Sequence, residues 1–319
     1  MNNDDYVNLV SKILIEHSRF TMAIRQMERS YLTAIQNGDP FCVAVVGESG
    51  TGKTRTLEYF ESLHGETQHK DYTEIPVLRV SVNAKPTIKG LAEEILRALG
   101  DPLAHKGTEN EKTERIITLM RGTRTYVLLL DEFQHFSDQG GRHIQHHVAD
   151  WLKVLVDEMR IGLVVSGITR TLNIIQKNEQ LARRFYAPII MKPFDWNIDE
   201  ERYEFIAFLS ELKPLVKPFV FPNLSYEEVA FRMHKASNGY IGHLMKIIQS
   251  SIMNAICTNT KTITMKDLNV AFTESIWGEI VTCNNPFTGS IESILATEGV
   301  THVGKMSKVY KPSSVSEIL

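Results

Sequence analysis

The sequence predicts an α/β domain built on a mostly parallel sheet, followed by a smaller helical domain. Its first two thirds contain five short apolar runs, each typical of a strand that is buried on both faces. Segments with helical periodicity separate these runs. After Phe194 the apolar runs stop and only helical periodicity remains. Alternation of strands and helices favours a parallel sheet with its ligand at the carboxyl ends of the strands.

Each element can be placed along the chain. The expected strands are FCVAVVGES, IPVLRVSV, TYVLLLDE, IGLVVSGI and APIIMKPF. A helical segment at 6–35 precedes them, and the helices expected between them are 54–63, 89–99, 111–121, 143–159 and 171–185. In the C-terminal part, Ser225 and Glu228 have the spacing of a capping box that opens a helix.

This pattern divides the chain into four parts. We expect an N-terminal helical segment at 1–38, an α/β core at 39–195, a helical lid at 196–280 and a tail at 281–319. The two ends lie outside the core and are candidate docking sites for partners. A surface helix and a fraying tail are the alternatives.

Composition limits the classes of function. The 319 residues are 43% hydrophobic, enough for a substantial core. A formal net charge of −3 argues against a general basic coat for nucleic acid, although a local basic patch is compatible with it. Three scattered cysteines do not make a disulfide framework. Without a signal-peptide pattern or a long apolar run, we expect a cytoplasmic protein that does not bind a membrane.

The stretch GESGTGKT fits the phosphate-loop pattern and lies between an expected strand and an expected helix. It predicts an ATP site whose backbone N–H groups surround phosphate. Lys53 would neutralise the terminal phosphates and the Thr54 hydroxyl would hold Mg²⁺. The alternative, a chance glycine loop, does not explain the strand–helix setting. The predicted nucleotide-binding residues are Gly47, Glu48, Ser49, Gly50, Thr51, Gly52, Lys53 and Thr54.

Acidic and polar residues follow the next strands. Asp131, at the end of YVLLLDE, can reach Mg²⁺, and Glu132 can activate the attacking water. Ser166 ends the following strand and can place a hydroxyl near the γ-phosphate, or it is an ordinary serine at a strand end. Arg183 and Arg184 end a helix, where they favour its dipole. One of them can instead reach the phosphates of a neighbouring subunit as an arginine finger.

Several motifs together resemble the TniB/TnsC transposition ATPases of the AAA+ superfamily. These are GESGTGKT, PTIKGLAEEILRALGDPLAHKGT, LLLDEFQHF, NEQLARRF and SNGYIGHLMKII, within residues 37–271. The resemblance implies a five-stranded AAA+ core, a helical lid and ATP held between neighbouring subunits. It also implies a ring or filament on duplex DNA that links a target-selection protein, similar to TniQ, to a transposase.

The resemblance assigns further roles. It places the arginine finger at Arg184, with Arg183 as a close competitor. His243 stands where relatives commonly carry a lid arginine that senses the γ-phosphate. Slow hydrolysis that depends on DNA or a partner would follow from that difference. His243 is therefore a candidate nucleotide-binding residue whose role is open.

Two polar loops are candidates for the DNA path. In this branch of AAA+ proteins the corresponding region faces the central channel, so their side chains would contact phosphates without reading bases. The alternative is a capped helix start with solvated lysines. The candidate DNA-binding residues are Lys85, Thr87, Lys89, Lys106 and Thr108.

Two other functions fit the same motifs. One is an AAA+ ATPase of signalling or secretion that never binds DNA. The other is a scaffold that binds ATP but scarcely hydrolyses it. Glu132 favours hydrolysis, because a site used only for binding would not need a second carboxylate.

Overall fold

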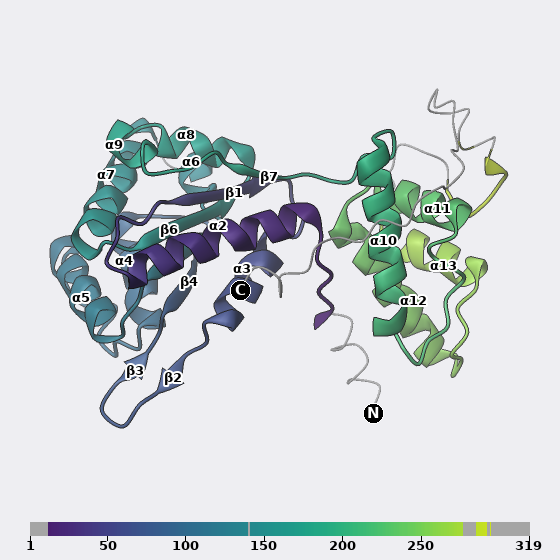
Figure 1. Cartoon of the computed structure of the whole chain (residues 1–319), viewed down its shortest axis with the longest axis horizontal. Coiled ribbons are helices and arrows are strands. Elements are labelled where there is room, and N and C mark those ends of the chain that lie inside the picture. The colour runs from purple at the N-terminus through teal and green to yellow at the C-terminus, as the bar shows by residue number, and fades with distance from the viewer. Residues whose placement is uncertain (1–11, 140, 277–284, 292–293, 295–319) are drawn as a thin grey trace. The chain divides into compact units, whose positions relative to one another are not determined.

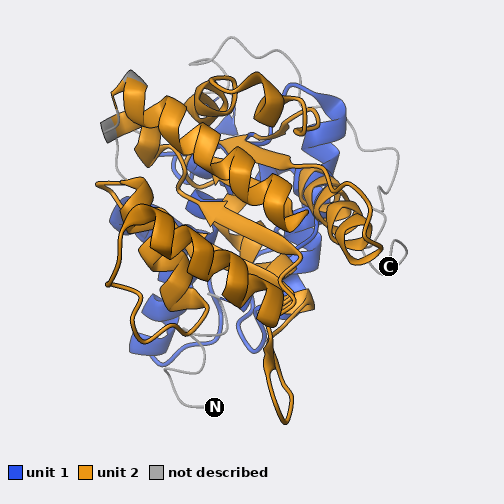
Figure 2. Cartoon of the chain, turned by 90° about the vertical axis from the view of Figure 1, so that its left-hand side faces the viewer, with its two compact units in different colours: residues 1–18, 192–317, 319 blue, residues 19–191, 318 orange. Residues whose placement is uncertain are grey.

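The structure is a computed structural model in which residues 12–139, 141–276, 285–291 and 294 are described. The chain forms two compact units (Figure 2). One comprises residues 19–191, and the other combines the described residues up to 18 with those from 192 onward. The expected boundary near residue 38 therefore does not separate an N-terminal unit, because most of the first long helix belongs with the sheet.

The first unit contains a five-stranded parallel sheet in the order β4-β5-β6-β1-β7. Each of the five predicted strands is confirmed. In register, Val45 of β1 lies beside Ser166 of β6 and Ile189 of β7. The carboxyl ends of β1, β5 and β6 therefore meet at one edge. The strands are β1 Val43–Gly47, β4 Val77–Ser81, β5 Val127–Asp131, β6 Gly162–Gly167 and β7 Ile189–Met191.

Helices cover both faces of this sheet (Figure 1). On one face, Ser30 of α2 packs so closely on β6 that a Cβ on Gly162 would lie 2.3 Å from its hydroxyl oxygen. The core formed with α4, α5 and α7 includes Leu128, Leu130 and Phe133. The helices are α2 Ser18–Ile35, α3 Lys53–Leu63, α4 Ile88–Ala98, α5 Glu109–Gly122, α6 His135–Gln139 and α7 Arg142–Met159.

The prediction of one helix at 171–185 is wrong. The segment contains a 3-10 turn and two short helices, η1 Thr169–Thr171, α8 Leu172–Ile175 and α9 Glu179–Ala182. Asn178 adopts an extended backbone and its side chain accepts a hydrogen bond from the N–H of Leu181, 2.8 Å away. An asparagine that caps a new helix in this way competes with continuation of the old one.

A small hairpin was not predicted. Strands β2 Thr67–Gln68 and β3 Thr73–Glu74 pair in antiparallel fashion, and the hairpin projects from the unit (Figures 1 and 2). The rings of His69 and Tyr72 stack beside its turn, with centroids 4.4 Å apart. Strands of two residues are too short to show an alternating pattern.

The second unit is helical, as predicted for the chain after Phe194. Its core includes Trp196, Phe205 and Phe231. No helix in the described part of the chain is both long and apolar enough to span a membrane. Residues 1–11 and most of the expected tail lie outside the described residues. The helices are α10 Asp199–Leu215, α11 Glu227–Ser237, α12 Ile241–Cys257 and α13 Met265–Ser275.

The predicted capping box at Ser225 and Glu228 is wrong. The Ser225 hydroxyl donates to the Asn223 side chain at 3.0 Å, and α11 begins at Glu227 without a side-chain cap. A capping box in this unit instead joins Thr264 and Asp267 at the start of α13. The Ser225 hydroxyl is hydrogen-bonded to the Asn223 side chain and does not cap the helix. The Ser–Glu spacing in the sequence was therefore not sufficient to predict a capping box.

Candidate nucleotide-binding site

The phosphate loop connects β1 to α3, as its sequence predicts. Gly50 and Gly52 have φ of 83° and 94°, a left-handed backbone that favours glycine. Gly52 is the N-cap of α3 and no side chain caps that helix. The first N–H groups of α3 can therefore donate to an anion, which the helix dipole also favours.

Gly47 is fixed by the sheet. A Cβ at this position would lie 1.9 Å from the carbonyl oxygen of Met191 on β7. No real Cβ tolerates such a distance from a backbone atom. The first glycine of the motif thus allows the close approach of a neighbouring strand.

Lys53 is the first residue of α3, and its side chain contacts the loop. It is only 8% exposed, and its Nζ donates to the carbonyl of Glu48 at 2.8 Å. Thr51 Oγ1 donates to the same carbonyl at 2.8 Å. Burial lowers the pKa of the Lys53 ammonium, while the nearby carboxylates of Glu132 and Asp131 act to raise it. The loop, the lysine and both acidic residues therefore form one site.

The acidic pair follows β5. Asp131 is buried, and its Oδ1 accepts a hydrogen bond from the backbone N–H of Glu132 at 2.9 Å. Glu132 has φ of 56°, a left-handed conformation that is uncommon for a glutamate and often marks functional sites. Carboxylate and hydroxyl oxygens are suitable Mg²⁺ ligands, so Asp131 and the exposed Thr54 fit this ion chemically.

A residue that the sequence analysis missed contacts the candidate base. Gln134 Nε2 donates a hydrogen bond to Glu132 Oε2. Three side-chain oxygens around Gly167 are buried without a hydrogen-bond partner in the described part of the chain, those of Gln134, Ser166 and Thr171. A Cβ on Gly167 would lie 2.4 Å from both Gln134 Oε1 and Thr171 Oγ1. Only the nearness of Gln134 to Glu132 in sequence could have indicated it.

The two candidate arginines differ in their contacts. Arg184 pairs with Asp39 at 2.9 Å and with Asp157 at 2.5 Å, and its side chain is 27% exposed. Arg183 is 81% exposed, and Glu179 lies 3.9 Å from it. Arg184 is therefore engaged within its own subunit, whereas Arg183 is available to another molecule.

His243 lies in the helical unit, in the first turn of α12. Its Nδ1 is 3.3 Å from the carbonyl of Ser237, and its ring packs on that of Tyr240. Burial lowers the pKa of this imidazole below its ordinary 6.5. His243 is therefore mainly neutral at pH 7 and does not supply the charge of a lid arginine.

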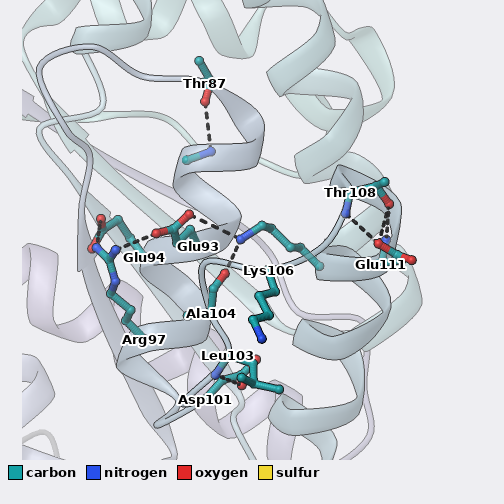
Figure 3. Close-up of polar contacts among 12 residues, drawn as sticks. Thr87, Glu93, Glu94, Arg97, Asp101, Leu103, Ala104, Lys106, Thr108 and Glu111 are labelled. Atoms are coloured by element: carbon teal, nitrogen blue, oxygen red, sulfur yellow. Dashed lines mark hydrogen bonds and ion pairs between the residues drawn. The ribbon is translucent and has the colours of Figure 1, made fainter.

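The candidate DNA residues surround helices α4 and α5 of the sheet unit. Lys85, Lys89 and Lys106 are exposed, and among the described residues none of their side-chain ammonium groups has a hydrogen bond or ion pair. Thr87 and Thr108 are the N-caps of α4 and α5 (Figure 3). Thr87 accepts from Gly90 N, which leaves its hydroxyl proton free, whereas the Thr108 hydroxyl donates to Glu111.

A buried lysine supports this surface. Lys112 is 0% exposed, and its Nζ donates to the carbonyl of Ala104 and to Glu93 at 3.3 Å. Arg115 pairs with Asp101 at 2.8 Å and donates to the carbonyls of Leu103 and Lys106. These contacts hold the α4–α5 loop. The sequence signal was a lysine on the buried stripe Lys112, Ile116 and Met120.

Comparison with known proteins first defines the class of fold. The chain is similar to the ORC2 protein of Aeropyrum pernix (TM-score 0.62, 16% identity, 84% of this chain and 71% of that one). It is similar to Cdc6p of Pyrobaculum aerophilum (TM-score 0.60, 17% identity, 85% of this chain and 71% of that one). It is also similar to the A. pernix ORC1 protein solved with DNA (TM-score 0.58, 17% identity, 84% of this chain and 69% of that one). At such identities the likeness shows the AAA+ fold.

The family follows from the sequence. The profile of the bacterial TniB protein matches residues 7–194, more than half of the chain, which therefore belongs to this family. The predicted resemblance is confirmed. No curated protein matches the sequence.

Proposed function

We propose that this protein is an ATP-dependent regulator of transposition that oligomerises on duplex target DNA and links target selection to a transposase. One observation carries the proposal: a phosphate loop occurs on the same unit of a TniB-family protein as three exposed lysines whose side chains have no partner among the described residues. A nucleotide site and an exposed basic surface on one unit are suited to making DNA binding conditional on ATP.

The loop and the acidic pair divide the chemistry of hydrolysis between them. The N–H groups from Gly50 to Thr54 and the Lys53 ammonium hold the phosphates, and the Glu132 carboxylate takes a proton from the attacking water. Gln134 orients that carboxylate. Thr54 and Asp131 would hold Mg²⁺, which neutralises charge on the phosphate oxygens.

Arg183 is the better candidate for the arginine finger. The finger must leave its own subunit, and a highly exposed side chain can do so. Arg184, which is held by Asp39 and Asp157, would position the segment that carries Arg183. This reverses the order that the resemblance suggested.

A scaffold that binds ATP with little hydrolysis is the second candidate function. One observation favours it: the lid position carries a histidine, and burial lowers the pKa of its imidazole, so this residue does not supply the charge of an arginine. A protein that hydrolyses ATP slowly, and only with DNA or a partner, would lie between the regulator and the scaffold. The transposase and a target-selection protein similar to TniQ are the proposed partners.

Electron microscopy of the full chain with duplex DNA tests the proposal. Samples would contain ATP, a non-hydrolysable analogue or no nucleotide. We expect rings or filaments on DNA with either nucleotide and none without. Assembly that is the same with and without nucleotide, or ATP turnover without DNA binding, would contradict the proposed function.

A matched variant separates the regulator from the scaffold. Glu132→Gln should form the same assemblies but hydrolyse ATP far more slowly, because the amide cannot accept the proton. Turnover equal to that of the unchanged protein would favour the scaffold. Gln134→Ala, in which Glu132 loses its amide partner, serves as the comparison variant.

A further inference from the structure

An open groove lies between helices α5 and α7, on the sheet unit and apart from the phosphate loop. Its volume is about 470 Å³, and Ile117, Trp151 and Val154 provide its apolar lining. Val154 is 50% exposed although it is a large apolar side chain. Trp151 is fixed there, since its Nε1 donates to Thr113 Oγ1 at 2.9 Å. The groove therefore presents a stable apolar floor.

Acidic side chains line this groove. They are Glu109, Glu114, Asp150 and Glu158. Three have partners, because Glu109 is 3.1 Å from His147, Asp150 accepts from Asn178 and Glu158 pairs with Arg121. Within the described part of the chain, Glu114 has no ion pair. The lining of the groove includes no lysine or arginine, so the groove is suited to a segment that is basic and partly apolar.

The chain itself contains such a segment. Residues 302–311 read HVGKMSKVYK, with lysines at 305, 308 and 311, apolar side chains between them and no acidic residue. This stretch lies outside the described residues. Its lysines match the acidic lining, and Val303, Met306 and Val309 match the apolar floor. This complementarity makes residues 302–311 the candidate occupant of the groove.

We propose that the groove of one copy binds residues 302–311 of a second copy. Lysine–carboxylate pairs at a surface are individually weak, so the contact is weak by itself. When copies are already held side by side, the effective concentration of the tail rises to about the millimolar range. The tail would therefore connect neighbours within an assembly. This inference rests on the proposed self-association.

Cross-linking of two full-length proteins tests the docking. One carries Val154→Cys and the other Val309→Cys, both with Cys257→Ser and Cys283→Ser; the remaining Cys42 is buried. We expect mild oxidation with ATP and DNA to yield a mixed disulfide dimer. The control replaces Val154→Cys with Met22→Cys on α2, whose native side chain is 53% exposed. Equal yields for the two pairs would overturn the proposal.

Charge reversal tests the electrostatic part. Lys308→Glu should lower the yield several-fold, and Glu114→Lys in the groove partner should restore it. No effect of either change would overturn the proposed complementarity. A protein that carries both cysteines and links only within its own chain would overturn docking to a second copy.

The outcomes also separate this inference from the proposed function. If rings or filaments form on DNA with ATP and the mixed disulfide does not, the docking is wrong and the proposed function stands. If concentrated protein forms the mixed disulfide but never assembles on DNA, the proposed function is wrong and the docking stands.

Discussion

The phosphate loop and the α4–α5 surface, formed by Lys85, Lys89 and Lys106 around these two helices, are both suited to phosphate, but they are built differently. The loop takes its shape from backbone, through the positive φ of Gly50 and Gly52. The α4–α5 surface takes its shape from side chains, because Lys112 and Arg115 hold the carbonyls of the loop between the helices. A site made from backbone depends on a few local residues. A site held by side chains depends on residues that never touch the ligand.

The largest expected effect concerns Arg183 and Arg184, the two candidate arginines. Arg183→Ala should lower ATP turnover of the assembled protein about 10³-fold, since arginine fingers contribute at least that much. Arg184→Ala should instead reduce the free energy of unfolding by about 1 kcal/mol, because exposed ion pairs are weak. Turnover assays and denaturant unfolding measure the two effects.

Mixing proteins gives the control. Arg183→Ala retains its phosphate loop, and a Lys53→Ala protein retains its finger, so the mixture should recover part of the lost turnover. A loss of turnover confined to Arg184→Ala would show that Arg183 is not the finger.

Lys53→Ala tests the backbone-built site by removing its main cation. We expect ATP affinity to fall roughly 10- to 150-fold, because a hydrogen bond to a charged group contributes about 1.5–3 kcal/mol. Titration with a fluorescent nucleotide measures this. The neighbouring Arg55→Ala is the control, since Arg55 pairs with Glu58 and is expected to leave affinity unchanged. Equal affinities for all three proteins would mean that the loop does not bind phosphate.

Lys112→Met tests the side-chain-built surface. Methionine keeps much of the lysine stem but leaves the Ala104 carbonyl without its donor, which should cost about 1–3 kcal/mol of unfolding free energy. DNA affinity should fall as well, because the loop that carries Lys106 loses its support. Lys106→Met, at an exposed position, should leave stability unchanged. If both variants unfold at the same denaturant concentration, Lys112 does not support the loop.

Alanine at Lys85, Lys89 and Lys106 should weaken DNA binding without unfolding the protein. The loss should be similar for unrelated DNA sequences, because phosphate contacts carry no sequence information. The slope of log affinity against log salt should become shallower by about 0.9 for each phosphate that the variant no longer neutralises. Lys70→Ala in the β2–β3 hairpin is the control. Unchanged affinity and slope in the triple variant would exclude this surface from the DNA path.

The smallest expected effect is a pH dependence from the helical unit. The pKa of His243 in the folded protein lies below 6.5, its ordinary value in an unfolded chain. Between the folded and the unfolded pKa, the unfolded chain therefore binds more protons than the folded protein. Stability should be fully present above pH 6.5 and fall as the pH drops through the folded pKa. Unfolding measured from pH 7.5 to 5 should show this slope, and His243→Gln should make it smaller. An identical slope in both proteins would contradict the burial of His243.

The same contrast explains what could be predicted. The five strands and the phosphate loop were found because each is one contiguous run whose pattern reflects its own backbone. Three features were missed: the helix break at Asn178, the capping box at Thr264 and the contact of Lys112 with the α4–α5 loop. Each depends on which of several possible partners a side chain contacts, and the partner can be close in sequence or distant. Gln134 lies in a stretch singled out for its acidic residues, and only its nearness to Glu132 in sequence hinted at their contact.

Burial of the Lys112 amine also determines how the protein reacts with acylating reagents. Such reagents need an accessible amine, so Lys85, Lys89 and Lys106 should be modified readily while Lys112 stays intact until the chain unfolds. Mass spectrometry of acylated protein would then report two things at once. Exposed lysines that duplex DNA protects from acylation would map the path of the DNA. An unmodified Lys112 would show that the molecules in the sample were folded.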